Sequence, residues 1–203
     1  MTMIFKFNNV KNLPIAIIDD FYSCEELKLI YQELFFLNNE LSKMYPPLIT
    51  GSAQEDIGQY LKNNIGISLD CTYSDRNISN ILTLNRKLFY PDFIKLLEQS
   101  HIFFRYLQES SSDKTKVHYF GNGSYYKNHR DGFVLTALSW FYKKPKKFLG
   151  GDLVIENLKI DCIENRMVIF PSILDHEVLM VEMTEEDENQ KNGRYCITQF
   201  IKI

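Results

Sequence analysis

The stretch VHYFGNGSYYKNHRDG, residues 117–132, places His129 and Asp131 two positions apart. In an extended strand the side chains alternate, so these two residues project from the same side, with Cα atoms roughly 7 Å apart. An imidazole and a carboxylate on one face supply two ligands to a metal ion. A tight site needs a third ligand from another segment.

The candidates for the third ligand are the other histidines of the chain, His101, His118 and His176. His101 is expected on the surface of a helix, and His118 on a strand, pointing opposite to its neighbour Tyr119. His176 begins a strand after a turn and is the natural third ligand. Two imidazoles and one carboxylate on one side of a metal are typical of non-haem Fe(II) oxygenases, in which other positions stay open. Each of these signals is weak when taken alone.

The segment GRYCITQF near the C-terminus indicates a site for an anion. Alternation along a strand places Arg194, Cys196, Thr198 and Phe200 on one face. If that face lines the interior of a barrel, the guanidinium of Arg194 is buried and needs an anionic partner, for which its planar fork fits a carboxylate. A dicarboxylate such as 2-oxoglutarate can chelate the metal at one end and meet Arg194 at the other.

Strands that would carry these residues recur from Thr115 onward, after a first half in which helices are expected. Turn signals separate the runs KVHYF, FVLTALSWFY, GDLVIE, RMVIF, HEVLMVEM and RYCITQFIKI. Helices followed by many short strands predict an α+β fold with a sandwich or barrel in the second half. We expect a single domain over residues 1–203, with a strand and supporting helices in 1–114 and the catalytic core in 115–203.

The first half contains a short apolar strand at Ile15–Ile18 and two predicted helices. Ser23 and Glu26 have the spacing of a capping box for a helix over Cys24–Phe36. A second helix is expected from about Pro91 to Leu107. The sequence favours neither a lid nor a core strand for residues 51–90. The acidic run 184–192 is interpreted as a solvated loop tip.

Charge and hydropathy exclude several classes of protein. The net charge is −3, whereas proteins that bind nucleic acid usually present a basic face. No run of apolar residues is long enough to span a membrane, and the first ten residues lack the features of a secretory signal. Cys24, Cys71, Cys162 and Cys196 are far apart, which favours reduced thiols. We therefore expect a cytoplasmic protein that binds neither nucleic acid nor membrane, and the oligomeric state stays open.

Five short segments, in the same order, resemble the 2-oxoglutarate- and Fe(II)-dependent dioxygenases, in particular the prolyl-4-hydroxylase-like branch. YFGNGSYYKNHRD is similar to the Y-P-G-N-G-x-x-Y-x-x-H-x-D segment of the oxygen-sensing prolyl hydroxylases. DHEV and RYCIT are similar to the strands that carry their distal histidine and their cosubstrate arginine. Gly150-Gly151 fits their double glycine, and IAIIDDFYSCEEL resembles their opening strand and helix.

The resemblance implies roles for the candidate residues. His129, Asp131 and His176 would ligate Fe(II). Arg194 would bind the distal carboxylate of 2-oxoglutarate, and Tyr119 would hydrogen-bond to the same group.

The resemblance also implies the fold and two further site residues. Tyr126 would line the pocket, and Thr198 would support the water network beside the metal. The implied fold is a double-stranded β-helix, or jelly-roll, with the N-terminal helices packed on its outside.

The implied reaction is the hydroxylation of an unactivated C–H bond, with decarboxylation of 2-oxoglutarate to succinate. Fe(II), 2-oxoglutarate and O₂ are the expected cofactors and cosubstrates, with ascorbate as a candidate reductant. Asp131 favours hydroxylation, because related halogenases lack this carboxylate. A protein or peptide residue is the preferred substrate, prolyl by resemblance, and a small molecule or a free amino acid is the alternative.

Other readings stay open at this point. A non-catalytic module would bind 2-oxoglutarate and metal as a sensor, and a zinc hydrolase would use the same ligands without a buried arginine. The DNA-alkylation-repair branch typically carries a second arginine six residues after the first, where this chain has Phe200. Phe133 and Trp140 stand where the oxygen sensors have an arginine and a tyrosine, and the gap between His176 and Arg194 is longer than usual. The substrate of those enzymes is therefore not carried over.

Overall fold

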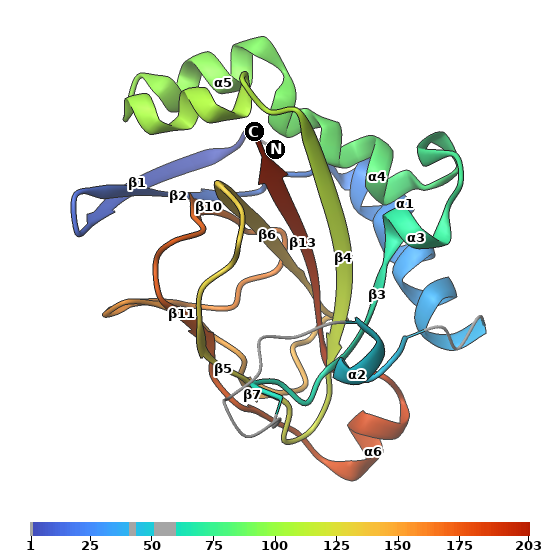
Figure 1. Cartoon of the computed structure of the whole chain (residues 1–203). Helices are drawn as coiled ribbons and strands as arrows, with labels where there is room; N and C mark the ends of the chain where they lie inside the picture. The colour runs from blue at the N-terminus through green and yellow to red at the C-terminus, as the bar shows by residue number, and fades with distance from the viewer. Residues whose placement is uncertain (1, 41–43, 51–59) are drawn as a thin grey trace.

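The computed structural model describes residues 2–40, 44–50 and 60–203. Seven antiparallel strands form the large sheet, in the order β1-β2-β10-β6-β13-β4-β3. These strands are β1 Ile4–Val10, β2 Leu13–Asp19, β3 Ile65–Ser68, β4 Ser112–Phe120, β6 Leu135–Phe141, β10 Met167–Pro171 and β13 Arg194–Lys202. Figure 1 shows β4 and β13 side by side in the middle of the fold.

A smaller sheet of four strands faces the large one, in the order β5-β11-β8-β9. Its strands are β5 Tyr126–His129, β8 Leu153–Ile155, β9 Leu158–Ile160 and β11 His176–Val178, and a two-stranded ladder pairs β7 Leu149–Gly150 with β12 Val181–Glu182. Side chains of both sheets line a common cavity. The fold is thus the predicted double-stranded β-helix.

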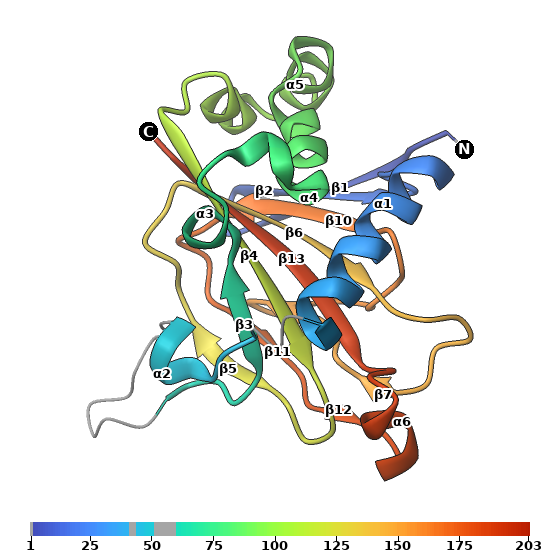
Figure 2. The same ribbon diagram turned by 90° about the vertical axis from the view of Figure 1, so that its right-hand side faces the viewer.

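The helices lie mainly on the outer face and at the ends of the large sheet (Figure 2). They are α1 Cys24–Phe35, α2 Pro47–Thr50, α3 Leu69–Thr72, α4 Asn80–Leu84, α5 Pro91–Glu98 and α6 Glu185–Asn189. Short helical segments of other types are the π-helix η1 Phe36–Glu40 and the 3₁₀ helices η2 Arg76–Ile78, η3 Asn85–Phe89 and η4 Ile102–Leu107. No helix of the described residues is long and apolar enough to cross a membrane.

Two apolar cores lie on the two faces of the large sheet. Along β13, Tyr195 and Ile197 pack toward the helices, while Cys196 packs into the space between the sheets. Strand β6 is buried at every position because both of its faces are covered. This double burial explains why the segment FVLTALSWFY is mostly apolar and does not alternate between apolar and polar residues.

The helix over Cys24–Phe36 is confirmed to within one residue, and its capping box is present. The Ser23 hydroxyl accepts a hydrogen bond from the Glu26 N–H at 3.2 Å, and the Glu26 carboxylate accepts one from the Ser23 N–H at 2.7 Å. Both bonds satisfy N–H groups that a helix start leaves without partners.

The single helix predicted over Pro91–Leu107 is wrong, because α5 ends at Glu98 and the separate segment η4 follows. His101 is the N-cap of η4, where its Nδ1 accepts a hydrogen bond from the Phe103 N–H at 3.1 Å. The cap gives the first turn of η4 a partner, which lets the chain change direction there.

The interpretation of the acidic run 184–192 as a loop tip is also wrong, because the run contains the helix α6. The Thr184 hydroxyl caps this helix by accepting from the Asp187 N–H at 3.1 Å. Four acidic residues lie in its first turn, where the helix dipole favours negative charge.

The stretch 51–90 is divided by the described ranges. Residues 60–90 contribute the edge strand β3 and several of the outer helices. Residues 51–59 lie outside the described part of the chain, so the lid interpretation is not tested there.

A buried asparagine fixes the segment that enters α1. Asn165 has a left-handed backbone (φ 62°), and its side chain exchanges two hydrogen bonds of 2.8 Å with the N–H and carbonyl of Tyr22. Its own carbonyl accepts from the Phe21 N–H at 3.1 Å. Asn165 therefore ties the residues before α1 to the turn before β10.

We predict that Asn165→Ala lowers the free energy of unfolding by about 2–4 kcal/mol, because two buried backbone groups lose their partners. Asn12→Ala is the matched control, since Asn12 has the same φ of 62° but is exposed in the β1–β2 turn. The control should lose only the backbone cost of about 1 kcal/mol. Urea unfolding of both variants measures the difference, and equal losses would contradict the role given to the Asn165 side chain.

Candidate active site

His129, Asp131 and His176 come together between the two sheets. His129 ends β5 and lies opposite His176 at the start of β11 in the strand register. Asp131 follows β5, where its N–H donates to the Ser172 carbonyl at 3.1 Å. One ligand atom from each of the three side chains lies within 4.8 Å of the others. The convergence predicted from the sequence is therefore present.

Backbone carbonyls orient both imidazoles. His129 Nδ1 lies 2.8 Å from the Lys127 carbonyl, and His176 Nδ1 lies 2.9 Å from the Leu174 carbonyl. A carbonyl can only accept, so in the neutral ring each Nδ1 carries the proton and each Nε2 presents a lone pair. Metal-binding histidines are usually held in this way.

The lone pairs of the two imidazoles are directed at a carboxylate. His176 Nε2 lies 3.3 Å from one oxygen of Asp131, and His129 Nε2 lies 3.8 Å from the other. Burial favours the neutral acid, but the nearby His176 and His129 side chains and the hydroxyl of Thr136 hold the pKa of Asp131 below its ordinary value. Burial, together with the neighbouring His176, lowers the pKa of His129 to about 4. A carboxylate and neutral imidazoles are the protonation states that bind a metal.

Thr136 fixes the position of the carboxylate. Its hydroxyl donates to Asp131 Oδ2 at 2.8 Å and lies 2.8 Å from the Ser172 hydroxyl. Because Thr136 donates its hydroxyl hydrogen to Asp131, the hydroxyl of Ser172 is the donor in the hydrogen bond between Ser172 and Thr136. This chain of hydroxyls gives Asp131 one preferred rotamer.

Arg194 is fully buried at the start of β13. Its guanidinium carbon lies 4.5 Å from the ring centre of Phe120 and 5.6 Å from that of Trp140. Nε and both Nη atoms have no hydrogen-bond partner among the described residues. Leaving a buried guanidinium without an anion is costly, so the site fits a ligand that carries a carboxylate.

Gly151 makes room for this arginine. A Cβ atom at Gly151 would lie 2.8 Å from Cδ of Arg194, and the backbone has a left-handed φ of 73°. The double glycine singled out in the sequence is thus explained at its second position, because any other residue would displace the stem of Arg194.

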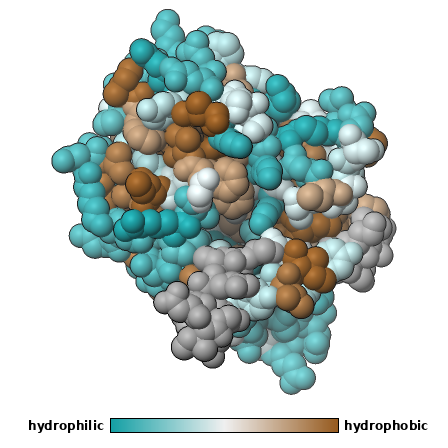
Figure 3. Space-filling view, in the orientation of Figure 1, coloured by the Kyte–Doolittle hydropathy of each residue, from teal (hydrophilic) through white to brown (hydrophobic). Residues whose placement is uncertain are grey.

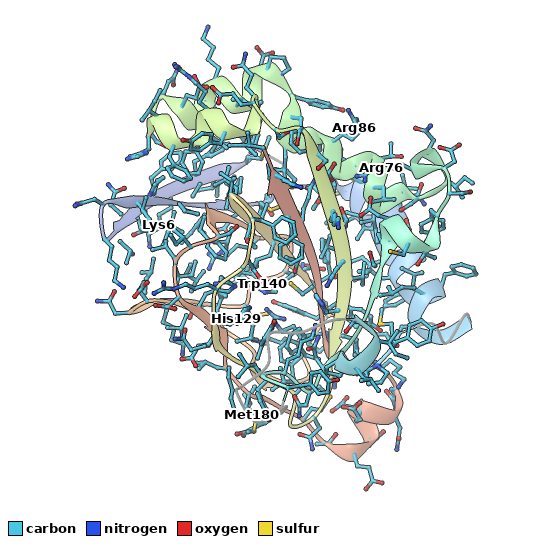
Figure 4. All side chains as sticks on the ribbon, in the orientation of Figure 1. Lys6, Arg76, Arg86, His129, Trp140 and Met180 are labelled. Atoms are coloured by element: carbon cyan, nitrogen blue, oxygen red, sulfur yellow. The ribbon has the colours of Figure 1, made fainter. Side chains whose placement is uncertain are left out.

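The triad and Arg194 line one cavity of about 840 Å³. Tyr126 and Thr198 also line it, and for Tyr126 this is the position that the resemblance implies. The Tyr126 ring stacks on His129 with a centroid distance of 3.6 Å, and the hydroxyl of Thr198 lies 3.6 Å from the Cys196 sulfur. In Figure 4, His129 and Trp140 are labelled in the middle of the molecule, between the sheets.

The role predicted for Tyr119 is wrong, because its ring lies on the face of β4 that points away from the cavity. The strand register pairs Arg194 with Phe120 and Tyr195 with Tyr119, so Phe120 shares the cavity face with the arginine. The Tyr119 hydroxyl instead accepts a hydrogen bond from the Gly193 N–H at 3.2 Å, within the helix-side core. Tyr119 therefore does not reach a carboxylate held by Arg194.

Several residues that line the cavity are not predicted from the sequence, and Lys62, Lys116 and His118 are among them. Alternation from Phe120 would have placed His118 and Lys116 on this face, once the register with Arg194 was known. Lys62 comes from the stretch about which the sequence says least, and no pattern there marks it.

Known proteins are similar to this chain in sequence over its second half and in fold. Residues 115–202 match the family model of the 2OG-Fe(II) oxygenase superfamily. A prolyl-4-hydroxylase from Pseudomonas putida has a similar structure, with a TM-score of 0.61 and 13% identity over 93% of this chain and 92% of that chain. SnoN, a non-haem α-ketoglutarate-dependent epimerase of nogalamycin biosynthesis, is similar with a TM-score of 0.54 and 10% identity over 93% of this chain and 77% of that one. No curated protein matches the sequence.

The family match and the site agree in their chemistry. Three side chains with the chemistry of metal ligands, and a buried guanidinium without a partner among the described residues, fit the Fe(II) and 2-oxoglutarate of the superfamily, whose reaction also uses O₂. The family match over residues 115–202, together with these side chains, identifies the protein as an Fe(II)- and 2-oxoglutarate-dependent dioxygenase.

Proposed function

We propose that the protein hydroxylates a C–H bond of its substrate at the cavity between the two sheets. His129, Asp131 and His176 would hold Fe(II), and Arg194 would hold the distal carboxylate of 2-oxoglutarate. When bound, the Fe(II) ion would supply oxidising power from O₂, while 2-oxoglutarate is decarboxylated to succinate. The observation that carries the proposal is the buried guanidinium of Arg194, which has no partner among the described residues and shares a cavity with the triad.

The charges of the site support this assignment. A ferrous ion with one carboxylate and two neutral imidazoles carries a net charge of about +1, and Arg194 adds another. The dianion of 2-oxoglutarate balances both charges when one end lies at the metal and the other at Arg194. A hydrolytic zinc site would not need the second positive charge.

The surrounding residues hold the metal ligands in place and exclude water. Thr136 positions Asp131 through its hydroxyl, and the Tyr126 ring covers one face of His129. Phe170 packs against His176 with a ring distance of 4.9 Å. A dry, rigid surrounding favours productive oxidation of the substrate over side reactions. We propose that Thr198 supports the water network beside the metal.

We further propose that residues 1–203 act as one catalytic domain, with 115–203 as its core. β1, β2 and β3 of the N-terminal part complete the large sheet, and α1 packs within the helix-side core. This sharing of one sheet supports a common folding unit.

For the substrate, we infer a protein or peptide residue, prolyl by resemblance. The similarity to the Pseudomonas putida prolyl-4-hydroxylase over nearly the whole of both chains supports this inference. A small molecule or free amino acid is the second candidate, favoured by the burial of Lys62 and His118 in the cavity. Mass spectrometry for the gain of one oxygen atom, over a panel of peptides and amino acids, separates the two.

The first prediction concerns the metal. Asp131→Ala should weaken Fe(II) binding by at least about 100-fold and abolish succinate release, because it removes the only anionic ligand of the triad. Asp175→Ala is the matched control, since Asp175 precedes His176 but pairs with Arg130 at the surface. Anaerobic iron titration and succinate assays measure both variants. Normal iron binding by Asp131→Ala would contradict the triad assignment.

The second prediction concerns the cosubstrate. Arg194→Met should raise the 2-oxoglutarate concentration for half-maximal succinate release by about 30-fold or more, as expected when a buried charge pair loses one partner. The ligand-free variant should be at least as stable as the wild type, because an unpaired buried cation has been removed. Arg130→Met, at an exposed ion pair, should change neither quantity. An unchanged 2-oxoglutarate requirement in Arg194→Met would refute its role.

A non-catalytic sensor remains distinguishable from the enzyme by one assay. The enzyme releases succinate from 2-oxoglutarate under O₂ with added Fe(II). A protein that binds 2-oxoglutarate but releases no succinate with any member of the substrate panel would be a binding module instead.

A further inference from the structure

The inner face of β4 carries basic groups that the proposed reaction does not use. The register places His118 opposite Cys196 and Lys116 opposite Thr198, both on the cavity side of β13. Lys62 joins them from the segment before β3, where it forms a bridge to Tyr126. Lys62, Lys116 and His118 are called the basic wall below.

Two members of the basic wall are deeply buried. Lys62 is 3% exposed and His118 is 7% exposed. The Nε2 atom of His118 has no hydrogen-bond partner among the described residues. Gly66 lies against this imidazole, because a Cβ atom there would come within 2.6 Å of His118 Cδ2. A polar side chain fixed this closely, with a ring nitrogen left without a partner, indicates a ligand.

Among the described residues, the ion pairs around the cavity leave the lysines of the basic wall without a carboxylate partner. Arg130 pairs with Asp175 and Asp70 pairs with Arg76, while Asp131 belongs to the triad. No carboxylate of the described residues forms an ion pair with Lys62 or with Lys116, whose Nζ donates to the Thr50 carbonyl at 2.8 Å. The two carboxylates of 2-oxoglutarate are assigned to the metal and to Arg194.

The basic wall adjoins the triad. Lys62 Nζ lies 5.4 Å from the ring centre of Tyr126, and that ring stacks directly on His129. An acidic group bound to this wall would therefore hold the rest of its molecule beside the metal ligands. Such anchoring fixes which C–H bond approaches the reactive centre.

We propose that Lys62, Lys116 and His118 form a subsite for an acidic group of the substrate, so that the enzyme hydroxylates molecules or peptide segments that carry a carboxylate near the target carbon. The inference rests on the proposed function and names its substrate class. Buried ammonium groups bind an anion strongly because little water competes with it.

The protonation of the lysines supports a ligand of this charge. Burial, with the charge of Lys116 nearby, lowers the pKa of Lys62 to about 8, and burial also lowers that of Lys116. An anion between the two ammonium groups would favour the charged form of both.

Lys114 provides a matched control on the same strand. It lies two residues from Lys116 and also borders the cavity, but its side chain is exposed. Replacement of Lys114 by Met removes the same charge from β4 without touching the buried groups. A general electrostatic effect would appear in this variant, whereas loss of the subsite would not.

The first experiment uses inorganic sulfate as an anion probe on the 203-residue protein loaded with Zn(II), without and with 2-oxoglutarate. We expect saturable binding by calorimetry, weakened about tenfold or more in Lys62→Met and Lys116→Met and unchanged in Lys114→Met. Lys62→Arg should retain most of the binding. Absence of saturable binding, or equal binding by all variants, would overturn the subsite. Binding that disappears when 2-oxoglutarate is present would place the anion at Arg194 and overturn it as well.

The second experiment identifies the substrate class. Free amino acids and their amides, and peptides with Asp or Glu and their Asn or Gln counterparts, are compared for stimulated succinate release and for hydroxylated product. The acidic member of each active pair should be turned over at least about tenfold faster at low concentration, and Lys62→Met should erase this preference. Equal turnover of acid and amide would refute the proposal. Succinate release without added substrate, by the wild-type protein and by Lys114→Met, tests the proposed dioxygenase function separately from this outcome.

Discussion

The buried guanidinium of Arg194 is the interaction around which the site is organised. β13 lies between β4 and β6 in the large sheet, and its first residue, Arg194, is paired with Phe120 of β4, while the pairing with β6 begins at the next residue. Phe120 and Trp140 flank the guanidinium, and Gly151 leaves space for its stem. A cation held in this way, without a carboxylate partner among the described residues, is the basis for the proposal that the cavity binds an organic anion.

The two sheets divide the work of the site between them. The smaller sheet supplies His129 and His176, and the large sheet supplies Arg194 and Thr136. Apolar residues between the sheets close the cavity, while the helices cover the outer face. On the surface shown in Figure 3, apolar side chains form several separate groups among hydrophilic ones, so no continuous apolar surface covers that face of the described residues.

The sequence predicted the parts of the site that depend on local alternation. The spacing of His129 and Asp131 and the phase of β13 are local, so both predictions hold in the structure. Tyr119 was misplaced because its role came from a family motif, whereas the phase of β4 is set by pairing with a strand about 75 residues away. Lys62 could not be found, since its place in the cavity depends on the bridge to Tyr126.

The outer elements show the same division between local and long-range causes. The capping box of α1 lies within four consecutive residues, Ser23 to Glu26, so the sequence alone predicts it. The separate helix η4 after α5 begins at a histidine cap, His101, and α6 begins at a threonine cap, Thr184. Both caps lie in polar segments whose composition is also typical of loops, so the sequence alone does not predict them. The fold itself does not fix the reaction, because a structurally similar protein, SnoN, is an epimerase. Residues that line the cavity, rather than the sheet that carries them, must therefore determine the substrate.

A crystal structure of the protein grown anaerobically with Fe(II) and 2-oxoglutarate tests the central claim most directly. The account predicts one metal ion bound by His129, Asp131 and His176, and a 2-oxoglutarate whose distal carboxylate accepts hydrogen bonds from Arg194. A metal ion bound elsewhere, or Arg194 paired with a carboxylate of the protein while 2-oxoglutarate lies outside the cavity, would contradict it.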